Sequence, residues 1–191
     1  MKFRPIITLP HKNLRQRSTK VGFIDEEVEK LADEMKAATL DWEDSREHEV
    51  GVALAAVQIN DLKRVVIIRN NFDDKKDREF QVFINPEITK FEGEIQEDYE
   101  GCLSIKDVYG KVPRHTKVRV KALNLEGQEI KLKAEGFLAR IFQHEIDHTK
   151  GIMFIDHIKD KEDVFFNLTP KGSLEKLNYD EKIKKSRILW Q

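Results

Sequence analysis

The feature that most constrains this chain is the segment Gln143–His148, which reads Gln-His-Glu-Ile-Asp-His. On a helix, His144 and His148 project from one face about one turn apart, because they stand four residues apart in the sequence. Two imidazole nitrogens placed in this way can bind a single metal ion, and Glu145 can reach a water molecule held by that ion. The segment therefore predicts a metal site, provided that it is helical.

The sequence around this segment favours a buried helix over Glu135–Thr149. The stretch contains no proline, and Gly151 follows as a C-terminal stop. Apolar side chains cover most of the helix circumference. The narrow polar strip holds Arg140, Gln143, Asp147 and Lys150. Buried histidines need partners for their ring nitrogens, so hydrogen-bonded structural histidines are the alternative to a metal site.

Length and charge limit the class of protein. The 191 residues suit one domain with a sizeable core. The 34 basic and 35 acidic residues nearly cancel, so charge gives no overall argument for binding nucleic acid or an anionic membrane. The single cysteine, Cys102, excludes an intrachain disulfide, and no stretch approaches the roughly eighteen apolar residues of a membrane span. We expect a cytoplasmic protein without sequence-specific nucleic-acid binding or membrane attachment.

The N-terminal segment leaves an organellar location open. No acidic residue precedes Asp25, whereas basic residues recur from Lys12 to Lys20. A basic segment without acidic residues resembles an organelle transit peptide. The resemblance described below favours a folded segment at this position instead.

Residue periodicity predicts a mixture of helix and antiparallel sheet, an α+β arrangement. Asp25–Asp44 is expected to be an amphipathic helix with Asp25 as its N-cap, and Asn70–Arg78 reads as a charged, solvated turn. We expect Asn85 and Pro86 to close the strand that begins at Phe80. The expected strands are Arg64–Arg69, Phe80–Ile84, Phe91–Tyr99 and the hairpin formed by Lys117–Leu123 with Glu129–Lys133.

The third ligand of the expected metal site has several candidates. A catalytic site of this type needs three protein ligands and one open position. A third histidine of the metzincin pattern would stand at position 154, where this chain has Phe154. A thermolysin-like site would use a downstream carboxylate such as Glu162 or Glu175, both in polar stretches. Cys102 is the remaining candidate, because one cysteine and two histidines form a known catalytic ligand set; a structural cysteine is the alternative.

Three stretches together resemble the peptide deformylase family. They are Gly-Val-Ala-Leu-Ala-Ala-Val-Gln at Gly51–Gln58, Glu-Gly-Cys-Leu-Ser at Glu100–Ser104, and Gln143–His148. They occur in the order found in the family and at similar separations, and three motifs in order are highly specific. Thr8–Arg15 also resembles the family's N-terminal segment. The resemblance covers residues 5–160 and leaves the C-terminal tail unexplained.

The resemblance implies a fold in which antiparallel sheets pack around a central metal-binding helix. We expect residues 1–160 to form the deformylase-like catalytic domain. Residues 161–191 are expected to form a charged C-terminal extension that packs on the same domain.

The resemblance also implies a set of site residues. Cys102, His144 and His148 match the family's metal ligands. Glu145 matches the catalytic acid and base, and the groups that match the oxyanion donors are the Gln58 amide and the Leu103 N–H. The positions that match the substrate cleft are Val52, Ala53, Gly101, Phe137 and Ile141.

The activity that the resemblance implies is metal-dependent removal of the N-formyl group from the N-terminal methionine of newly made peptides, with release of formate. One divalent metal ion per chain is expected, Fe(II) in the cell with zinc, nickel or cobalt as substitutes. The expected partners are N-formylmethionyl nascent chains at the ribosome, and the expected oligomeric state is a monomer.

Three departures from the family pattern bear on substrate preference more than on reaction type. They are Ala53 in place of a second glycine, Lys106 in place of proline, and Thr149 in place of leucine. Two alternatives remain open. One is a zinc peptidase that uses His144, His148 and a downstream carboxylate, and the other is a metal-stabilised binding protein without turnover.

Overall fold

The computed structural model of this protein describes residues 4–190. Residues 1–3, at the start of the expected catalytic domain, lie outside this range, as does residue 191 at the end of the expected C-terminal extension. Its two α-helices are α1 (Glu26–Asp44) and α2 (Gly136–His148), and its antiparallel strands form one sheet in the order β1-β2-β3-β4-β6-β7, with β5 paired to β4. The strands are β1 (Ala53–Ala55), β2 (Val65–Arg69), β3 (Phe80–Cys102), β4 (Ile105–Leu123), β5 (Glu129–Glu135), β6 (Phe165–Leu168) and β7 (Leu174–Lys176). The predicted α+β class is confirmed.

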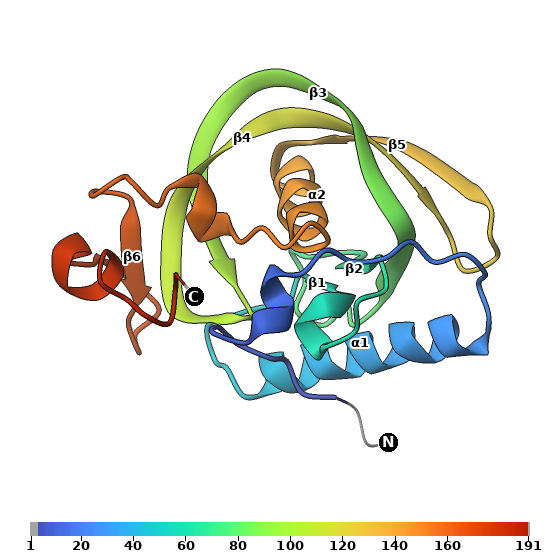
Figure 1. The fold of residues 1–191 in the computed structure, drawn as a ribbon, viewed down its shortest axis with the longest axis horizontal. Helices are drawn as coiled ribbons and strands as arrows, with labels where there is room; N and C mark the ends of the chain where they lie inside the picture. Colours follow the sequence, from blue (N-terminus) through green and yellow to red (C-terminus); the bar gives the residue numbers. More distant parts are fainter. Residues whose placement is uncertain (1–3, 191) are drawn as a thin grey trace.

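The long strands β3 and β4 form an arch around α2 (Figure 1). Their register shifts at four places, and β-bulges of this kind bend a strand pair. The prediction that a strand closes at Asn85 and Pro86 was wrong, because β3 continues through both residues. Asn85 has a φ of 52°, and one register shift lies between Ile84 and Glu87. A bulge accommodates the proline, which has no N–H for the strand ladder. The expected strands at Phe80 and Phe91 are therefore one strand.

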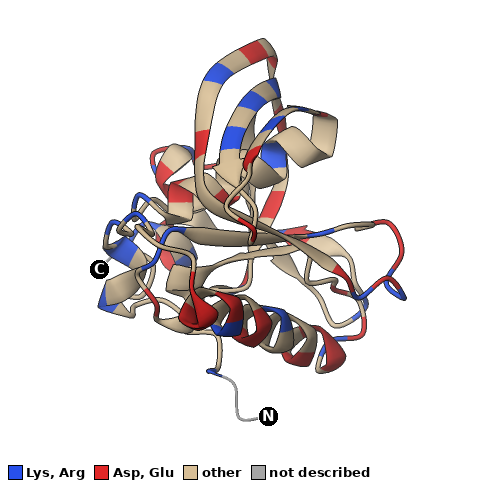
Figure 2. Ribbon diagram, turned by 90° about the vertical axis from the view of Figure 1, so that its right-hand side faces the viewer, with Lys and Arg blue, Asp and Glu red and all other residues tan. Residues whose placement is uncertain are grey.

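The sheet separates two hydrophobic cores, because side chains alternate between its faces. On the face of Ala53 and Ala55, the core includes Phe142 and Ile146 of α2. On the face of Leu54, the core is closed by α1 through Val28, Leu31, Met35 and Ala38. The predicted helix α1 is confirmed, and the Asp25 carboxylate accepts hydrogen bonds from the backbone N–H groups of Glu27 and Val28, both at 3.1 Å. Acidic residues follow the length of α1 (Figure 2).

The helix α2 is placed by the hairpin that precedes it. β4 pairs with β5 from Lys117 opposite Glu135 to Leu123 opposite Glu129, which confirms the predicted hairpin. Gly136 follows directly with a φ of 58° and begins the helix. Every residue from Ala139 to His148 is buried. The helix therefore holds its two histidines inside the arch.

The C-terminal residues pack on the N-terminal segment. Ile183 and Leu189 are buried in a third core that also holds Leu14, and the Arg15 guanidinium donates to the Leu189 carbonyl at 2.9 Å. The boundary at residue 160 stays a prediction. No helix among residues 4–190 combines the length and the hydropathy that crossing a membrane would require.

Candidate metal centre

Three side chains bring their potential ligand atoms together, although Cys102 is distant in the sequence from the two histidines. Cys102 ends β3, and His144 and His148 lie one turn apart on α2. The distance from Cys102 Sγ to His148 Nε2 is 3.3 Å, and the two Nε2 atoms lie 3.2 Å apart. All three ligand atoms lie within 4.8 Å of one another. The structure therefore brings together Cys102, His144 and His148, which we expected from the sequence to be metal ligands.

The chemistry of this group fits a divalent metal ion. A thiolate and two imidazoles form a donor set for zinc or Fe(II). Burial, together with His144, lowers the pKa of His148 well below its ordinary value, so this ring is neutral and ready to bind a metal. Burial acts against a charge on His144, but hydrogen bonds with Cys102 and Glu100 raise its pKa. A metal ion would bind His144 through Nε2 only when that nitrogen carries no proton, so metal binding here would release a proton.

The carboxylates of the alternative ligand set lie elsewhere. Glu162 and Glu175 are both exposed. Within residues 4–190, the group of potential ligands around His144 and His148 is completed by Cys102 and includes neither glutamate. This arrangement favours the cysteine over a downstream carboxylate as the third ligand.

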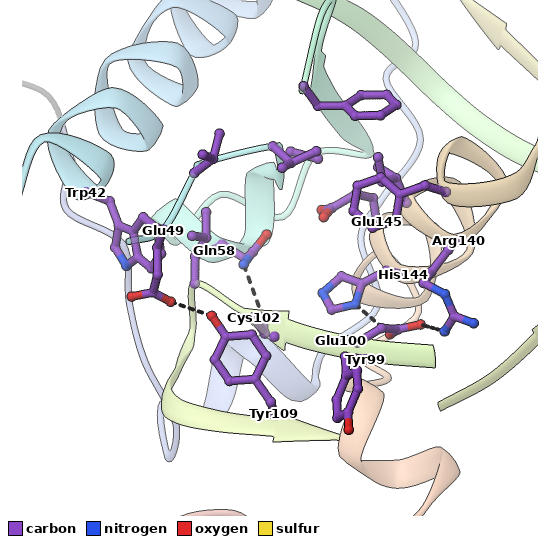
Figure 3. Close-up of a pocket in the computed structure, with 18 of the residues that line it drawn as sticks. Trp42, Glu49, Gln58, Tyr99, Glu100, Cys102, Tyr109, Arg140, His144 and Glu145 are labelled. Atoms are coloured by element: carbon purple, nitrogen blue, oxygen red, sulfur yellow. Dashed lines mark hydrogen bonds and ion pairs between the residues drawn. The ribbon is translucent and has the colours of Figure 1, made fainter. Parts of the chain in front are cut away.

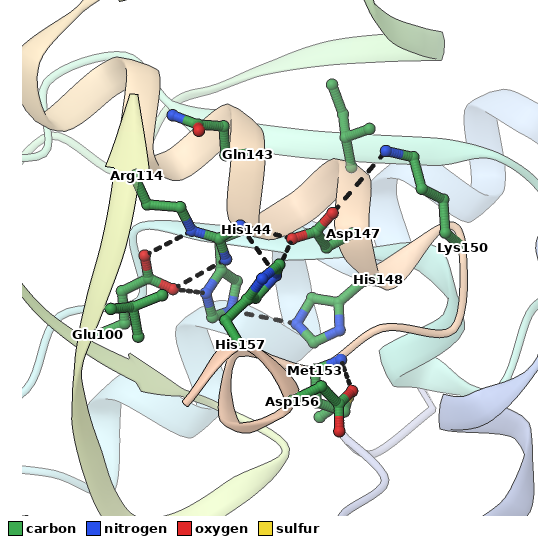
Figure 4. Close-up of polar contacts among 12 residues, drawn as sticks. Glu100, Arg114, Gln143, His144, Asp147, His148, Lys150, Met153, Asp156 and His157 are labelled. Atoms are coloured by element: carbon green, nitrogen blue, oxygen red, sulfur yellow. Dashed lines mark hydrogen bonds and ion pairs between the residues drawn. The ribbon is translucent and has the colours of Figure 1, made fainter. Parts of the chain in front are cut away.

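A buried carboxylate orients the first histidine. Glu100 accepts a hydrogen bond from Arg140 Nη1 at 2.8 Å (Figure 3). It also accepts from His144 Nδ1 at 2.9 Å and from Arg114 Nε at 2.9 Å (Figure 4). Burial opposes ionisation of Glu100, but the bonds from His144 and Arg114 outweigh it and lower its pKa. Because the carboxylate fixes Nδ1 of His144, Nε2 faces Cys102 and His148.

The network continues from Arg114 to Asp147 of α2. Asp147 accepts a hydrogen bond from Arg114 Nη1 at 2.5 Å and contacts His157 Nε2 at 2.7 Å. The sequence predicts Asp147 on the polar strip of α2, but it does not indicate Arg114 or His157 as its partner. These residues come from β4 and from the short helix Phe154–His157, and no local pattern links them.

Replacing Glu100 with glutamine is expected to weaken metal binding about 10- to 100-fold, because a neutral amide holds His144 Nδ1 less firmly. Arg140 then lies buried without its carboxylate partner, so the free energy of unfolding should fall by about 3–5 kcal/mol. Metal titration and urea unfolding measure the two effects. Glu97→Gln on the same strand, an exposed carboxylate paired with Lys161, is the control. A metal affinity equal to that of the unchanged protein would contradict this role.

Glu145 is a buried carboxyl group placed to exchange protons. Burial is the main cause that raises its pKa from 4.5 to about 7. Its Oε2 atom has no hydrogen-bond partner among the described residues. A carboxyl group with a pKa near neutral can both accept and donate a proton at physiological pH.

The raised pKa of Glu145 predicts that this side chain lowers the unfolding free energy of the metal-free protein as the pH rises and the carboxyl group ionises. The stabilisation from binding a proton at Glu145 is fully present below the unfolded pKa of 4.5 and is lost as the pH rises through about 7. The shift corresponds to about 3 kcal/mol. Glu145→Gln should therefore raise the unfolding free energy of the metal-free protein by up to about 3 kcal/mol at pH about 8, and hardly at pH about 4. Urea unfolding at both pH values checks this, and an equal effect at both would refute it.

Gln58 points its amide nitrogen at Cys102. Its Oε1 atom accepts a hydrogen bond from the Ala55 N–H at 2.9 Å, which fixes the amide. Its Nε2 atom lies 3.6 Å from Cys102 Sγ and donates to Ser104 Oγ at 3.2 Å. Leu103 occupies the turn between β3 and β4, directly after Cys102.

A cleft of about 390 Å³ opens over these groups (Figure 3). The structure brings every predicted catalytic and substrate-binding residue to its lining: Val52, Ala53, Gln58, Gly101, Leu103, Phe137, Ile141 and Glu145. His144 and Cys102 also line it, whereas His148 lies fully buried behind them.

Several residues that line this cleft were not predicted from the sequence. Phe72 lines it and packs edge-on against Phe137, with ring centroids 5.3 Å apart, although its segment reads as a solvated turn. Tyr109 lies so close to Gly101 that a Cβ there would stand 2.5 Å from its ring. The Tyr109 hydroxyl donates to Glu49 at 2.6 Å (Figure 3). Gly101 is therefore required by the close approach of this ring.

Comparison with known proteins adds independent findings. The sequence model of a family described as Polypeptide deformylase matches residues 3–164. A peptide deformylase of Thermomicrobium roseum is 42% identical over 164 residues, which cover 84% of this chain and 89% of that protein. A solved peptide deformylase of Synechococcus elongatus in complex with actinonin matches with a TM-score of 0.74 and 31% identity, over 84% of each chain. A Met-Ala-Ser-bound peptide deformylase of Acinetobacter baumannii matches with a TM-score of 0.72 and 35% identity, over 82% of this chain and 99% of that one.

Proposed function

This chain belongs to the polypeptide deformylase family, and we propose that Cys102, His144 and His148 hold one divalent metal ion in its active site. The chain is a metal-dependent hydrolase that removes the N-formyl group from the N-terminal methionine of newly made peptides. The observation that carries the site assignment is the approach of three ligand atoms to within 4.8 Å of one another beside the cleft.

Glu145 is the proposed acid and base of the reaction. A bound divalent ion supplies a Lewis acid, which makes a water molecule acidic enough to lose a proton near neutral pH. Glu145 accepts that proton and returns it to the amine that leaves when the formyl group is removed. Burial raises the pKa of this carboxyl group to about 7 in the metal-free protein, which favours its acceptance of the proton.

Gln58 and Leu103 are the proposed donors to the formyl oxygen. Negative charge develops on that oxygen as the carbonyl carbon is attacked, and donors that are already oriented stabilise it. The Ala55 N–H fixes the Gln58 amide with its nitrogen toward Cys102, so this donor needs no reorganisation. Losing one such donor typically costs about 100- to 1000-fold in rate.

The apolar part of the cleft is the proposed pocket for the methionine side chain. Phe72, Phe137 and Ile141 line it, and their contacts with an apolar side chain would exclude water. Val52 and Ala53 line the adjoining wall, where we propose that the peptide backbone lies.

We propose Fe(II) as the metal in the cell, with zinc, nickel or cobalt able to replace it. Membership of the family supports Fe(II), and the soft thiolate of Cys102 with two imidazoles suits zinc as well. The same thiolate makes the site sensitive to oxidation. We also propose that the chain acts in the cytoplasm as a monomer on nascent chains at the ribosome. The complete ligand set within one chain supports a site that needs no second copy.

The assay that tests this function is formate release from formyl-Met-Ala-Ser by freshly reduced, Fe(II)-loaded protein. Deformylation predicts one formate and one Met-Ala-Ser per turnover. Cleavage between amino acids, independent of Cys102, would instead identify the zinc peptidase. Binding of the peptide without formate would identify a binding protein without turnover.

A further inference from the structure

We propose that the buried ion pair between Glu43 and Arg69 positions the peptide-binding wall of the cleft. This inference rests on the proposed function, because it concerns how the formylated peptide is held. Glu43 lies near the end of α1 and Arg69 ends β2. Their side chains are 1% and 0% exposed, and Arg69 Nη2 lies 2.5 Å from Glu43 Oε2.

The pair holds the backbone of Gly51 from both sides. The Gly51 N–H donates to Glu43 Oε2 at 2.8 Å, and the Gly51 carbonyl accepts from Arg69 Nε at 3.1 Å. Gly51 also packs directly on α1, where an added Cβ would lie 2.5 Å from the Thr39 side chain. Val52 and Ala53, the next two residues, line the cleft. The ion pair therefore fixes the backbone immediately before the residues that face the substrate.

The same guanidinium also holds the segment that follows β2. Arg69 Nη1 donates to the carbonyls of Asp77 at 2.9 Å and Lys75 at 3.3 Å. These carbonyls belong to the segment between β2 and β3 that carries Phe72, which packs on Phe137 at the cleft. The buried Arg69 side chain thus joins the backbone of Gly51, which precedes the peptide-binding residues, to the loop that carries Phe72.

The geometry explains why an arginine is needed at this position. The planar guanidinium offers donors in a fixed fork, and here they reach one carboxylate and three backbone carbonyls. Replacing a buried ion pair by apolar residues often leaves stability unchanged or higher, so stability alone does not require this pair. β1 is the first strand in the order of the sheet, so among residues 4–190 one of its edges has no strand paired to it. We place the extended peptide along that edge. A displaced Gly51 would move that edge.

Two variants separate positioning from folding. The double variant Glu43→Met/Arg69→Met removes both charges together, which avoids leaving one charge buried without its partner. Arg69→Lys keeps a charge opposite Glu43 but loses the fork, and it decides the matter if the double variant does not fold. The matched control is Asp44→Asn/Arg78→Gln, which removes an exposed pair at 2.9–3.0 Å between the end of α1 and the same loop.

The measurement is the Kd for Met-Ala-Ser binding to metal-loaded protein, together with the KM and kcat for formyl-Met-Ala-Ser. We expect both variants to bind Met-Ala-Ser about tenfold more weakly and to show a similar rise in KM, with kcat little changed. The control should match the unchanged protein. Metal content should stay at one ion per chain in all of them.

The outcomes distinguish this proposal from the proposed function. Absence of formate from the unchanged protein would overturn deformylation, while the Kd values still judge the ion pair. Three results would overturn the positioning role. They are an unchanged Kd in the variants, no binding of Met-Ala-Ser by the unchanged protein, and a loss confined to kcat or to metal content.

Discussion

Replacing Glu145 with alanine is expected to lower the rate of formate release by about 100- to 10,000-fold, with metal content unchanged. Glu145 is not one of the three clustered ligands, so its removal leaves Cys102, His144 and His148 in place. It is the buried carboxyl group of the cleft whose pKa lies at about 7. Without it, the attacking water and the leaving amine lose the group that exchanges their proton.

Elemental analysis and kcat for formyl-Met-Ala-Ser, measured on the same preparation, check this expectation. Glu162→Ala is the control, because this exposed glutamate is a candidate of the peptidase alternative. Its formate release should equal that of the unchanged protein. Full turnover by the Glu145 variant would remove Glu145 from its role, and loss of metal would show that its role is structural.

Replacing Cys102 with serine is expected to weaken metal binding by more than about 100-fold and to abolish formate release with it. Removing a group that only supports a ligand typically costs about 10- to 100-fold in metal affinity, and here a ligand itself is lost. The thiolate binds Zn or Fe(II) far better than a neutral hydroxyl. His144 and His148 would remain as two ligands, one fewer than a catalytic site of this kind needs.

Dialysis against a graded series of chelator concentrations, followed by elemental analysis, measures this change. His144→Ala is the matched variant and should lose the metal to a similar degree. A Cys102→Ser protein that keeps one ion per chain would refute the ligand assignment and revive the peptidase alternative, in which the thiol is dispensable.

The parts of the fold that could be predicted are those written in local patterns. The apolar spacing of α1 with its Asp25 cap, and the alternation of the β4–β5 hairpin, both depend on neighbours in the sequence. The continuation of β3 through Asn85 and Pro86 could not be predicted in this way. A proline predicts a strand end unless a bulge absorbs it, and the bulge depends on the partner strand.

The residues of the candidate site also fall into those that the sequence predicts and those that it does not. The helical pair His144 and His148 is a local pattern. The single cysteine made Cys102 one of several candidates for the third ligand, and resemblance to a family selected it and added the role of Gln58. The buried partners escaped prediction because they meet only in the folded chain. Arg114 reaches Glu100 across 14 residues and Asp147 across 33. Charged residues in a sequence are usually exposed, so no pattern marks those that will be buried and paired.

X-ray absorption at the metal edge of the zinc-loaded protein tests the proposed ligand set, because it reports the atoms bound to the ion. We expect one sulfur and two imidazole nitrogens per ion, contributed by Cys102, His144 and His148. The sulfur signal should vanish in Cys102→Ser protein forced to bind metal at high concentration. A spectrum of the unchanged protein with only nitrogen and oxygen ligands would show that Cys102 does not bind the metal.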